Sequence, residues 1–332
     1  MTHPQPNQSV PVENALAASA SEATSKRSSA DDKQISNASP ERLYQQVADG
    51  AACKRHDAGW FGARRSRGAA QSSTVLAERV DSDDCPKVSL LGVEFDNVSR
   101  LELLSRLKRG VVFTPNVDHI MKLRRDRDFL EIYQKADYRV CDSQILMYVS
   151  KFLGKPLKGK LSGSDLFPWF CDYHRHNETV KIFLLGGAAG VASQARARIN
   201  ERIGREIVVG EYAPPYGFET DLEECEKVLA MLESSAANVV AVCLGAPKQE
   251  KWIATYREKL PSIDIFMAVG ATVDFEAGVK SRAPKFASEI GLEWLYRLIC
   301  EPRRLWRRYL LDSFPFVGLV MAEKLRQLRL MR

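Results

Sequence analysis

The chain has no apolar run long enough to cross a membrane as a helix. Its longest apolar stretch, residues 314–322, falls well short of the ~20 residues that a bilayer requires, and it contains Pro315. The N-terminus shows neither the basic start nor the apolar core of a secretory signal. The seven cysteines are scattered, without a C-x-x-C pair or a pairing pattern. We therefore expect a protein of a reducing, cytosolic compartment.

The motifs of dinucleotide and metal binding are incomplete. Gly186, Gly187 and Gly190 follow an apolar strand pattern but give only part of the G-x-G-x-x-G signature. Glycines let a backbone approach a phosphate group, so Gly186 and Gly187 are candidates for substrate binding, although a structural turn explains them equally well. Two D-x-D patterns, at 81–83 and 126–128, do not follow strands. The sequence therefore predicts no metal site and no cofactor.

The charge is unevenly distributed along the chain. The whole chain has a net charge of +6, and residues 279–332 hold twelve Lys and Arg residues against five acidic ones. That segment alone has a net charge of +7, so the rest is nearly neutral. A basic end on a neutral body is typical of proteins that contact phosphate groups or an anionic membrane surface.

The sequence divides into three parts. Residues 1–86 are rich in Ser, Ala, Gln, Asp and Lys without apolar periodicity, which predicts a disordered tail. In residues 87–290, apolar strand patterns alternate with helix patterns, which predicts an α/β domain with a Rossmann-like parallel sheet and helices on both faces. Residues 291–332 are expected to form a basic amphipathic helical appendage. Within the α/β domain, the first strand is expected over 88–95 and one charged helix over 119–136.

One strand, turn and helix unit is especially informative. The apolar run 238–243 ends in a turn at Gly245, and Pro247 stands where a helix can begin. Ligands of α/β proteins bind at this kind of edge, and Lys248 and Gln249 would project there as candidates for substrate binding. Most such loops are plain connections, so the unit alone does not establish a site.

Three polar residues end two other predicted strands. Thr114 and Asn116 follow one strand, and Asp142 ends another whose core residues are apolar. Asp142 is a candidate general base that takes a proton from an acceptor hydroxyl, or it caps the next helix. Thr114 and Asn116 are candidates for hydrogen bonds to a sugar, or they shape the turn around Pro115. The residues alone leave these alternatives open.

Four arginines share one side of a predicted C-terminal helix. At 100° per residue, Arg304, Arg307 and Arg308 fall within about 140° of Arg303, and aromatic and aliphatic side chains fill most of the opposite arc. Either this helix packs on its own domain, or it lies at a membrane surface, where Arg binds phosphate and Trp and Tyr suit the interface.

Together these features resemble the WecG/TagA/CpsF bacterial glycosyltransferases, which are glycosyltransferase family 26. The resemblance covers about residues 88–309. Its most specific segments are 244–250, 269–275 with 277–278, 282–285, and 291–298 followed by 301–304.

The resemblance implies an inverting, metal-independent transfer of a hexose from a UDP-sugar to a sugar linked through pyrophosphate to undecaprenol. It implies that the family's base falls on Asp142 and that its substrate-holding residues fall on Thr114, Asn116 and Gln249. The family's basic appendage is thought to reach the membrane and help close the site. The implied candidates for binding the lipid pyrophosphate or UDP are Arg297, Arg303, Arg304, Arg307 and Arg308.

The implied partners are a UDP-sugar, an undecaprenyl-pyrophosphate-linked sugar and an anionic membrane surface on the inner face of the cell membrane, without nucleic acid. Whether the chain forms a homo-oligomer stays open. One departure concerns the donor, because the family usually has Gly after the catalytic Asp, whereas Ser143 follows Asp142 here. The donor sugar therefore stays open among N-acetylmannosamine, glucose and a uronic acid, in exopolysaccharide or cell-envelope polysaccharide synthesis.

Two other classes of function compete with this one. A nucleotide-binding α/β oxidoreductase needs a complete dinucleotide fingerprint with an acid about 20 residues later, and that fingerprint is missing. A nucleic-acid-binding protein would use the basic tail, but the Trp and the apolar face of that tail favour lipid.

Overall fold

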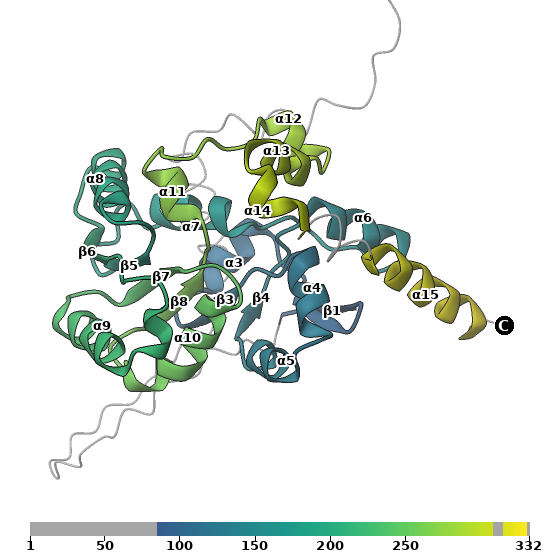
Figure 1. The fold of residues 1–332 in the computed structure, drawn as a ribbon, viewed down its shortest axis with the longest axis horizontal. Helices are drawn as coiled ribbons and strands as arrows, with labels where there is room; N and C mark the ends of the chain where they lie inside the picture. The colour runs from purple at the N-terminus through teal and green to yellow at the C-terminus, as the bar shows by residue number, and fades with distance from the viewer. Residues whose placement is uncertain (1–84, 308–314, 331–332) are drawn as a thin grey trace, which may run out of the picture. The chain divides into compact units, whose positions relative to one another are not determined.

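The computed structural model describes residues 85–307 and 315–330, and six parallel strands form its main sheet (Figure 1). The strand order is β4-β3-β8-β7-β5-β6. The strands are β3 (Gly110–Phe113), β4 (Tyr138–Arg139), β5 (Ile182–Gly186), β6 (Val208–Tyr212), β7 (Val239–Cys243) and β8 (Ile265–Ala268). This arrangement confirms the predicted α/β fold. The predicted tail, residues 1–86, lies almost wholly outside the described residues.

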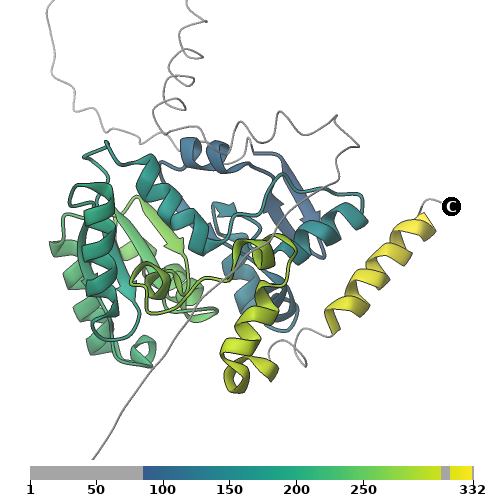
Figure 2. The same cartoon turned by 90° about the horizontal axis from the view of Figure 1, so that it is seen from above.

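Helices cover both faces of this sheet (Figures 1 and 2). On one face lie α4 (Val117–Leu123), α5 (Arg127–Gln134), α9 (Leu222–Ser234) and α10 (Lys248–Tyr256). On the other lie α3 (Arg100–Arg106), α7 (Gly163–Tyr173), α8 (Val191–Ile203) and α11 (Thr272–Glu276). All residues of β5 and β7 are buried, as expected of central parallel strands packed on both sides.

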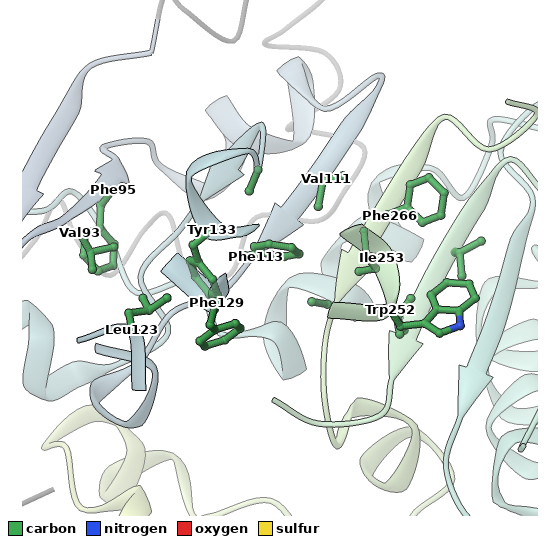
Figure 3. Close-up of a cluster of buried hydrophobic side chains, with 14 of the residues drawn as sticks. Val93, Phe95, Val111, Phe113, Leu123, Phe129, Tyr133, Trp252, Ile253 and Phe266 are labelled. Atoms are coloured by element: carbon green, nitrogen blue, oxygen red, sulfur yellow. The ribbon is translucent and has the colours of Figure 1, made fainter. Parts of the chain in front are cut away.

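An aromatic cluster fills the core beside β3. The Tyr133 ring lies 4.9 Å from that of Phe113 and 5.0 Å from that of Phe129, measured between centroids. Figure 3 shows these three side chains together, with Trp252 and Ile253 of α10 facing Phe266 of β8 farther along the sheet. Large buried rings contribute much of the apolar area that holds a helix against a sheet. Close packing of large side chains therefore supports the ends of β3 and β8.

The first predicted strand is wrong in one respect. Residues 88–95 do not form one strand of the main sheet but an antiparallel hairpin of β1 (Lys87–Leu90) and β2 (Val93–Asp96). Leu91 and Gly92 form the turn with φ of 56° and 85°. Positive φ at both positions is typical of a type I′ hairpin turn, and Gly92 adopts it without strain.

The predicted helix over 119–136 is also wrong, because it is broken into α4 and α5. Asp126 starts the second helix by accepting a hydrogen bond from the backbone N–H of Phe129 at 2.9 Å. Aspartate is a preferred residue at this position, since its carboxylate satisfies a free N–H group. The 126–128 pattern is thus a helix start, and Asp126 also pairs with Lys251 at 3.0 Å.

The C-terminal part is helical. It comprises α12 (Lys285–Glu289), α13 (Glu293–Cys300), α14 (Pro302–Trp306) and α15 (Pro315–Leu330). Phe316 and Val320 of α15 join the core cluster, and Lys324 donates to the carbonyl of Phe152 at 2.9 Å, at the end of α6 (Gln144–Phe152). No helix in the described ranges is both long and apolar enough to cross a membrane. Two short 3₁₀ helices, η2 (Phe218–Thr220) and η3 (Arg257–Lys259), complete the described elements.

Candidate active site

The carboxyl ends of the neighbouring strands β3 and β4 carry three of the predicted site residues. The backbone N–H of Asp142, after β4, donates to the carbonyl of Pro115 at 3.0 Å, and the Thr114 hydroxyl lies 3.5 Å from the carbonyl of Ala268 at the end of β8. Neighbouring strands β3 and β8 lead into α4 and α11, which cover opposite faces of the sheet. Such divergence opens the crevice in which α/β proteins bind ligands. Thr114, Asn116 and Asp142 therefore belong to one edge.

The carboxyl of Asp142 is only partly exposed and has an unusual acidity. Its pKa is raised to about 8, mainly by burial and also by the nearby carboxylate of Glu293. Arg297 and Lys160 act in the opposite direction. The protonation of Asp142 therefore depends on charged groups of α13 and of the loop before α7. The sequence did not connect these segments.

Helix α13 is held at this edge by polar contacts. The ammonium of Lys160 donates to the Ser288 hydroxyl at 2.7 Å and lies 3.8 Å from the Glu293 carboxylate. Glu293 also accepts a hydrogen bond from Arg297, one helical turn later. Although burial alone would raise the pKa of Glu293, Arg297 and Lys160 hold it below its usual value. An ionised carboxylate thus stands beside Asp142.

Sequence reasoning missed both Lys160 and Glu293. Lys160 belongs to no pattern, so only the fold shows where it lies. Glu293 had a usable signal, because Glu293 and Arg297 have the i,i+4 spacing of a helical ion pair inside one of the recognised segments.

A pocket of about 280 Å³ lies between α11 and α13. Ala271 and Phe275 line it from one side, and Tyr296 and Arg297 from the other, with Lys280 between. The Arg297 guanidinium lies 5.6 Å from the centroid of the Phe275 ring. Aromatic faces and cations suit a base or sugar ring joined to phosphate groups. The pocket is near the lower end of the size range of ligand sites, which begins at roughly 300 Å³.

Gln249 and Lys248 have partners within the protein. The side-chain oxygen of Gln249, Oε1, accepts from the backbone N–H groups of Gly245 and Gly270, at 3.2 and 3.0 Å. Only 4% of the residue is exposed. Lys248 pairs with Glu219, and its ammonium lies 4.2 Å from the centroid of the Tyr216 ring. Gln249 thus ties the β7 and β8 loops together, and substrate binding by Lys248 and Gln249 stays a prediction.

Packing alone accounts for Gly186 and Gly187. Both have positive φ, of 114° and 91°. A Cβ atom on Gly186 would lie 2.7 Å from the carbonyl oxygen of Cys243, and one on Gly187 would lie 2.9 Å from a methyl carbon of Val273. Real Cβ atoms do not approach so closely, so the turn requires glycine without any ligand. Substrate binding at these glycines stays a prediction.

The predicted arginines are only partly described. Arg303 and Arg307 are exposed near the end of the first described range, 85–307. Trp306, between them, is 45% exposed. The side chain of Arg304 and the whole of Arg308 lie outside the described residues. Their roles in binding lipid pyrophosphate or UDP stay predictions.

No described group of three or more His, Cys, Asp or Glu side chains is arranged to hold a metal ion. The 126–128 pattern belongs to this part of the chain, whereas the 81–83 pattern lies outside it.

Comparisons with known proteins show which family the chain resembles. The profile of the glycosyl transferase WecG/TagA/CpsF family matches residues 88–330. A Staphylococcus aureus protein, from strain MRSA252, is 29% identical over 252 residues, which cover 73% of this chain and 95% of the relative. Its counterpart from strain NCTC 8325 is 28% identical over the same length. Both are named N-acetylglucosaminyldiphosphoundecaprenol N-acetyl-beta-D-mannosaminyltransferase.

Proposed function

The chain belongs to the glycosyl transferase WecG/TagA/CpsF family, and we propose that it transfers a hexose from a UDP-sugar to a sugar carried on undecaprenyl pyrophosphate. The names of the Staphylococcus aureus relatives support N-acetylglucosaminyl-diphosphoundecaprenol as the acceptor and N-acetylmannosamine as the first donor sugar to test. Glucose and a uronic acid are the other donors to test, because Ser143 follows Asp142 near the sugar. The product enters cell-envelope polysaccharide synthesis. The family assignment favours this function over an oxidoreductase or a nucleic-acid-binding protein.

The observation that carries this proposal is the position of Asp142 at the carboxyl edge of the sheet, where its pKa is raised. The acceptor hydroxyl attacks C1 of the donor sugar on the face opposite to UDP, and the Asp142 carboxylate takes the hydroxyl proton. The bond between C1 and the diphosphate oxygen breaks, and UDP leaves with the electron pair. One bond forms as the other breaks, so the configuration at C1 inverts.

Cations at the same edge support the departure of UDP. Negative charge grows on the diphosphate as the bond to C1 breaks, and fixed cations stabilise that charge. Arg297 and Lys280 line the pocket beside α11 and are the groups we assign to this role. Each has a carboxylate partner now, since Arg297 pairs with Glu293 and Lys280 pairs with Asp274 at 2.8 Å. A bound diphosphate would compete with those partners.

The lipid part of the acceptor calls for contact with a membrane surface. Helix α15 exposes four large apolar side chains at helical spacing, which are Val317, Met321, Leu325 and Leu328. The same helix also carries Lys324, Arg326 and Arg329. A helix with exposed apolar and cationic side chains suits the interface of an anionic bilayer. We assign the protein to the inner face of the cell membrane as a peripheral protein.

The test is a screen for UDP release in EDTA. UDP-N-acetylmannosamine, UDP-glucose, UDP-N-acetylglucosamine and UDP-glucuronate are each offered with a short-chain polyprenyl-pyrophosphate sugar. Release that depends on the acceptor, with one donor, supports the proposal and names the donor. Full dependence on a metal ion, or no transfer with any pair, contradicts it.

A further inference from the structure

A chain of buried polar side chains links the ends of three strands at the candidate site. The Nδ1 atom of His119 lies 2.8 Å from the Asn116 side-chain oxygen, and its Nε2 atom lies 3.4 Å from Oε1 of Glu250. The same Oε1 accepts from the Gln249 amide at 3.0 Å. His119 is 5% exposed and Glu250 is fully buried. Through Gln249 the chain reaches the backbone of Gly270 after β8.

The contacts of Asn116 fix where its hydrogens point. Its Oδ1 accepts from the backbone N–H groups of Asp118 and His119, at 3.1 and 3.3 Å, as is typical of the N-cap residue of a helix. Because Oδ1 faces these donors, His119 Nδ1 must also carry a proton to approach it at 2.8 Å. In the other tautomer, Nδ1 would accept from the backbone N–H of Asn116 at 3.3 Å, but Nδ1 and Oδ1 would then be two acceptors 2.8 Å apart, so we assign the proton to Nδ1. Three donors thus occupy Oδ1, and the two Nδ2 hydrogens are the donors that Asn116 can offer to a ligand.

Glu250 completes the chain. At 3.4 Å its contact with His119 Nε2 is long for a hydrogen bond, so Glu250 positions the imidazole ring by a close polar contact. A buried carboxylate without a cationic or hydrogen-bonded partner is very costly. Glu250 therefore contacts both the imidazole and the Gln249 amide through its Oε1 atom.

We propose that His119 and Glu250 are positioning residues of the transferase site, which present the Asn116 amide as a donor to a substrate oxygen. Glu250 also orients Gln249, which joins the β7 and β8 loops. This inference rests on the proposed function, because the substrate contact is assigned to Asn116. Neither His119 nor Glu250 touches the substrate in this account.

Matched substitutions separate this role from packing. The His119 ring lies 6.4 Å from the Phe129 ring and 5.9 Å from the Tyr133 ring, so His119→Phe preserves a ring among aromatic neighbours but removes both polar links. His174 is the control, since its ring also packs on an aromatic side chain, 4.5 Å from Phe170. It follows α7, roughly 16 Å of helix from the site end of that helix. His174→Phe is therefore the same change away from the site.

The experiment is a double-mutant cycle on kcat/KM for sugar transfer. Asn116→Asp keeps the helix start but removes the Nδ2 donor. We expect Asn116→Asp and His119→Phe each to lower kcat/KM about tenfold, which is roughly the loss of one hydrogen bond. Because His119 acts through Asn116, the double variant loses clearly less than the product of the two effects. His174→Phe stays within about twofold of the wild type.

Glu250 supplies a rescue test. Glu250→Gln keeps the side-chain oxygen that accepts from the Gln249 amide and fills the same volume beside the imidazole. We therefore expect it to stay within about threefold of the wild type, whereas Glu250→Leu falls as far as His119→Phe. Independent effects in the cycle, or full activity of His119→Phe, overturn the inference while the wild-type enzyme still transfers sugar. A wild type that transfers no sugar contradicts the proposed function instead. In that case, imidazole ¹⁵N spectra still test the geometry, which predicts a proton on His119 Nδ1 and is overturned by an unprotonated Nδ1.

Discussion

The carboxyl edge of the sheet and the helix α13 beside it are built by different forces. Helix α10 at the edge buries five residues, including Trp252 and Gln249, whereas α13 buries none completely. The edge is held by apolar packing and buried hydrogen bonds. Helix α13 is linked to the loop before α7 by the contact of Glu293 with Lys160 at 3.8 Å, and both side chains are partly exposed. Partly exposed ion pairs contribute only ~0–1 kcal/mol each to stability.

This difference matches two requirements of the proposed mechanism, a fixed base and cations that can exchange partners. A general base must be held at a fixed, short distance from the reacting hydroxyl, and Asp142 lies on the packed edge of the sheet. Cations that bind and release a diphosphate must exchange partners, and Arg297 stands on the weakly held helix. Burial raises the pKa of Asp142 most, and Glu293 and Arg297 of the same helix adjust it, so under the proposed mechanism the position of α13 affects both the leaving group and the base.

The largest effect should come from the packed edge. Asp142→Asn removes the proton acceptor and leaves the shape of the site nearly unchanged. We expect kcat to fall about 10²–10⁴-fold, the usual contribution of general base catalysis. Acceptor-dependent UDP release measures it, and Asp172→Asn on the exposed side of α7 is the control. Activity of Asp142→Asn close to that of the wild type would show that another group is the base.

A smaller effect is expected from the apolar side of α15. Met321→Glu with Leu325→Glu places two charges among the exposed apolar residues, so binding to anionic vesicles should fall about tenfold or more. Ala322→Glu with Gln327→Glu adds the same charge outside this stripe and is the control. Sedimentation with vesicles measures the difference. Equal losses in both double variants would mean that net charge alone drives binding.

The smallest effect concerns stability. The folded pKa of Asp142 is raised from 3.8 to about 8, so the folded protein keeps a proton that the unfolded chain releases. The associated stabilisation is fully present below pH 3.8 and is lost as the pH rises through 8. Since Asp142→Asn cannot ionise, it should melt about 3 °C or more above the wild type at pH 9, and the gap should narrow toward pH 5. Melting curves at both pH values test this, and a constant gap contradicts it.

The sequence predicted the sheet and the residues at its edge because both depend on local patterns. Apolar runs such as 238–243 mark buried strands, and polar residues such as Asp142 mark their ends. It mispredicted the hairpin at 88–95, since the two-residue turn at Leu91 and Gly92 interrupts an otherwise continuous strand pattern. The break at Asp126 was hidden in the same way among charged residues.

The surroundings of Asp142 could not be predicted from the sequence. Lys160 and Glu293 are 133 residues apart, and only tertiary packing brings them to the same carboxyl. The buried contact of His119 with Glu250 also joins distant segments. Long-range electrostatic contacts leave no periodic signal in a sequence, which explains why the candidate base was found and its neighbours were not.

The most direct test of the central claim is the pH dependence of kcat/KM in the wild type and two variants of α13. The wild-type rate should rise with pH through an apparent pKa near 8, as the free Asp142 carboxyl ionises. Because Arg297 lowers this pKa and Glu293 raises it, Arg297→Gln should move the profile to higher pH and Glu293→Gln to lower pH. Shifts in these opposite directions are the predicted result. Unchanged profiles, or shifts in the same direction, would contradict the claim that α13 adjusts the acidity of the base.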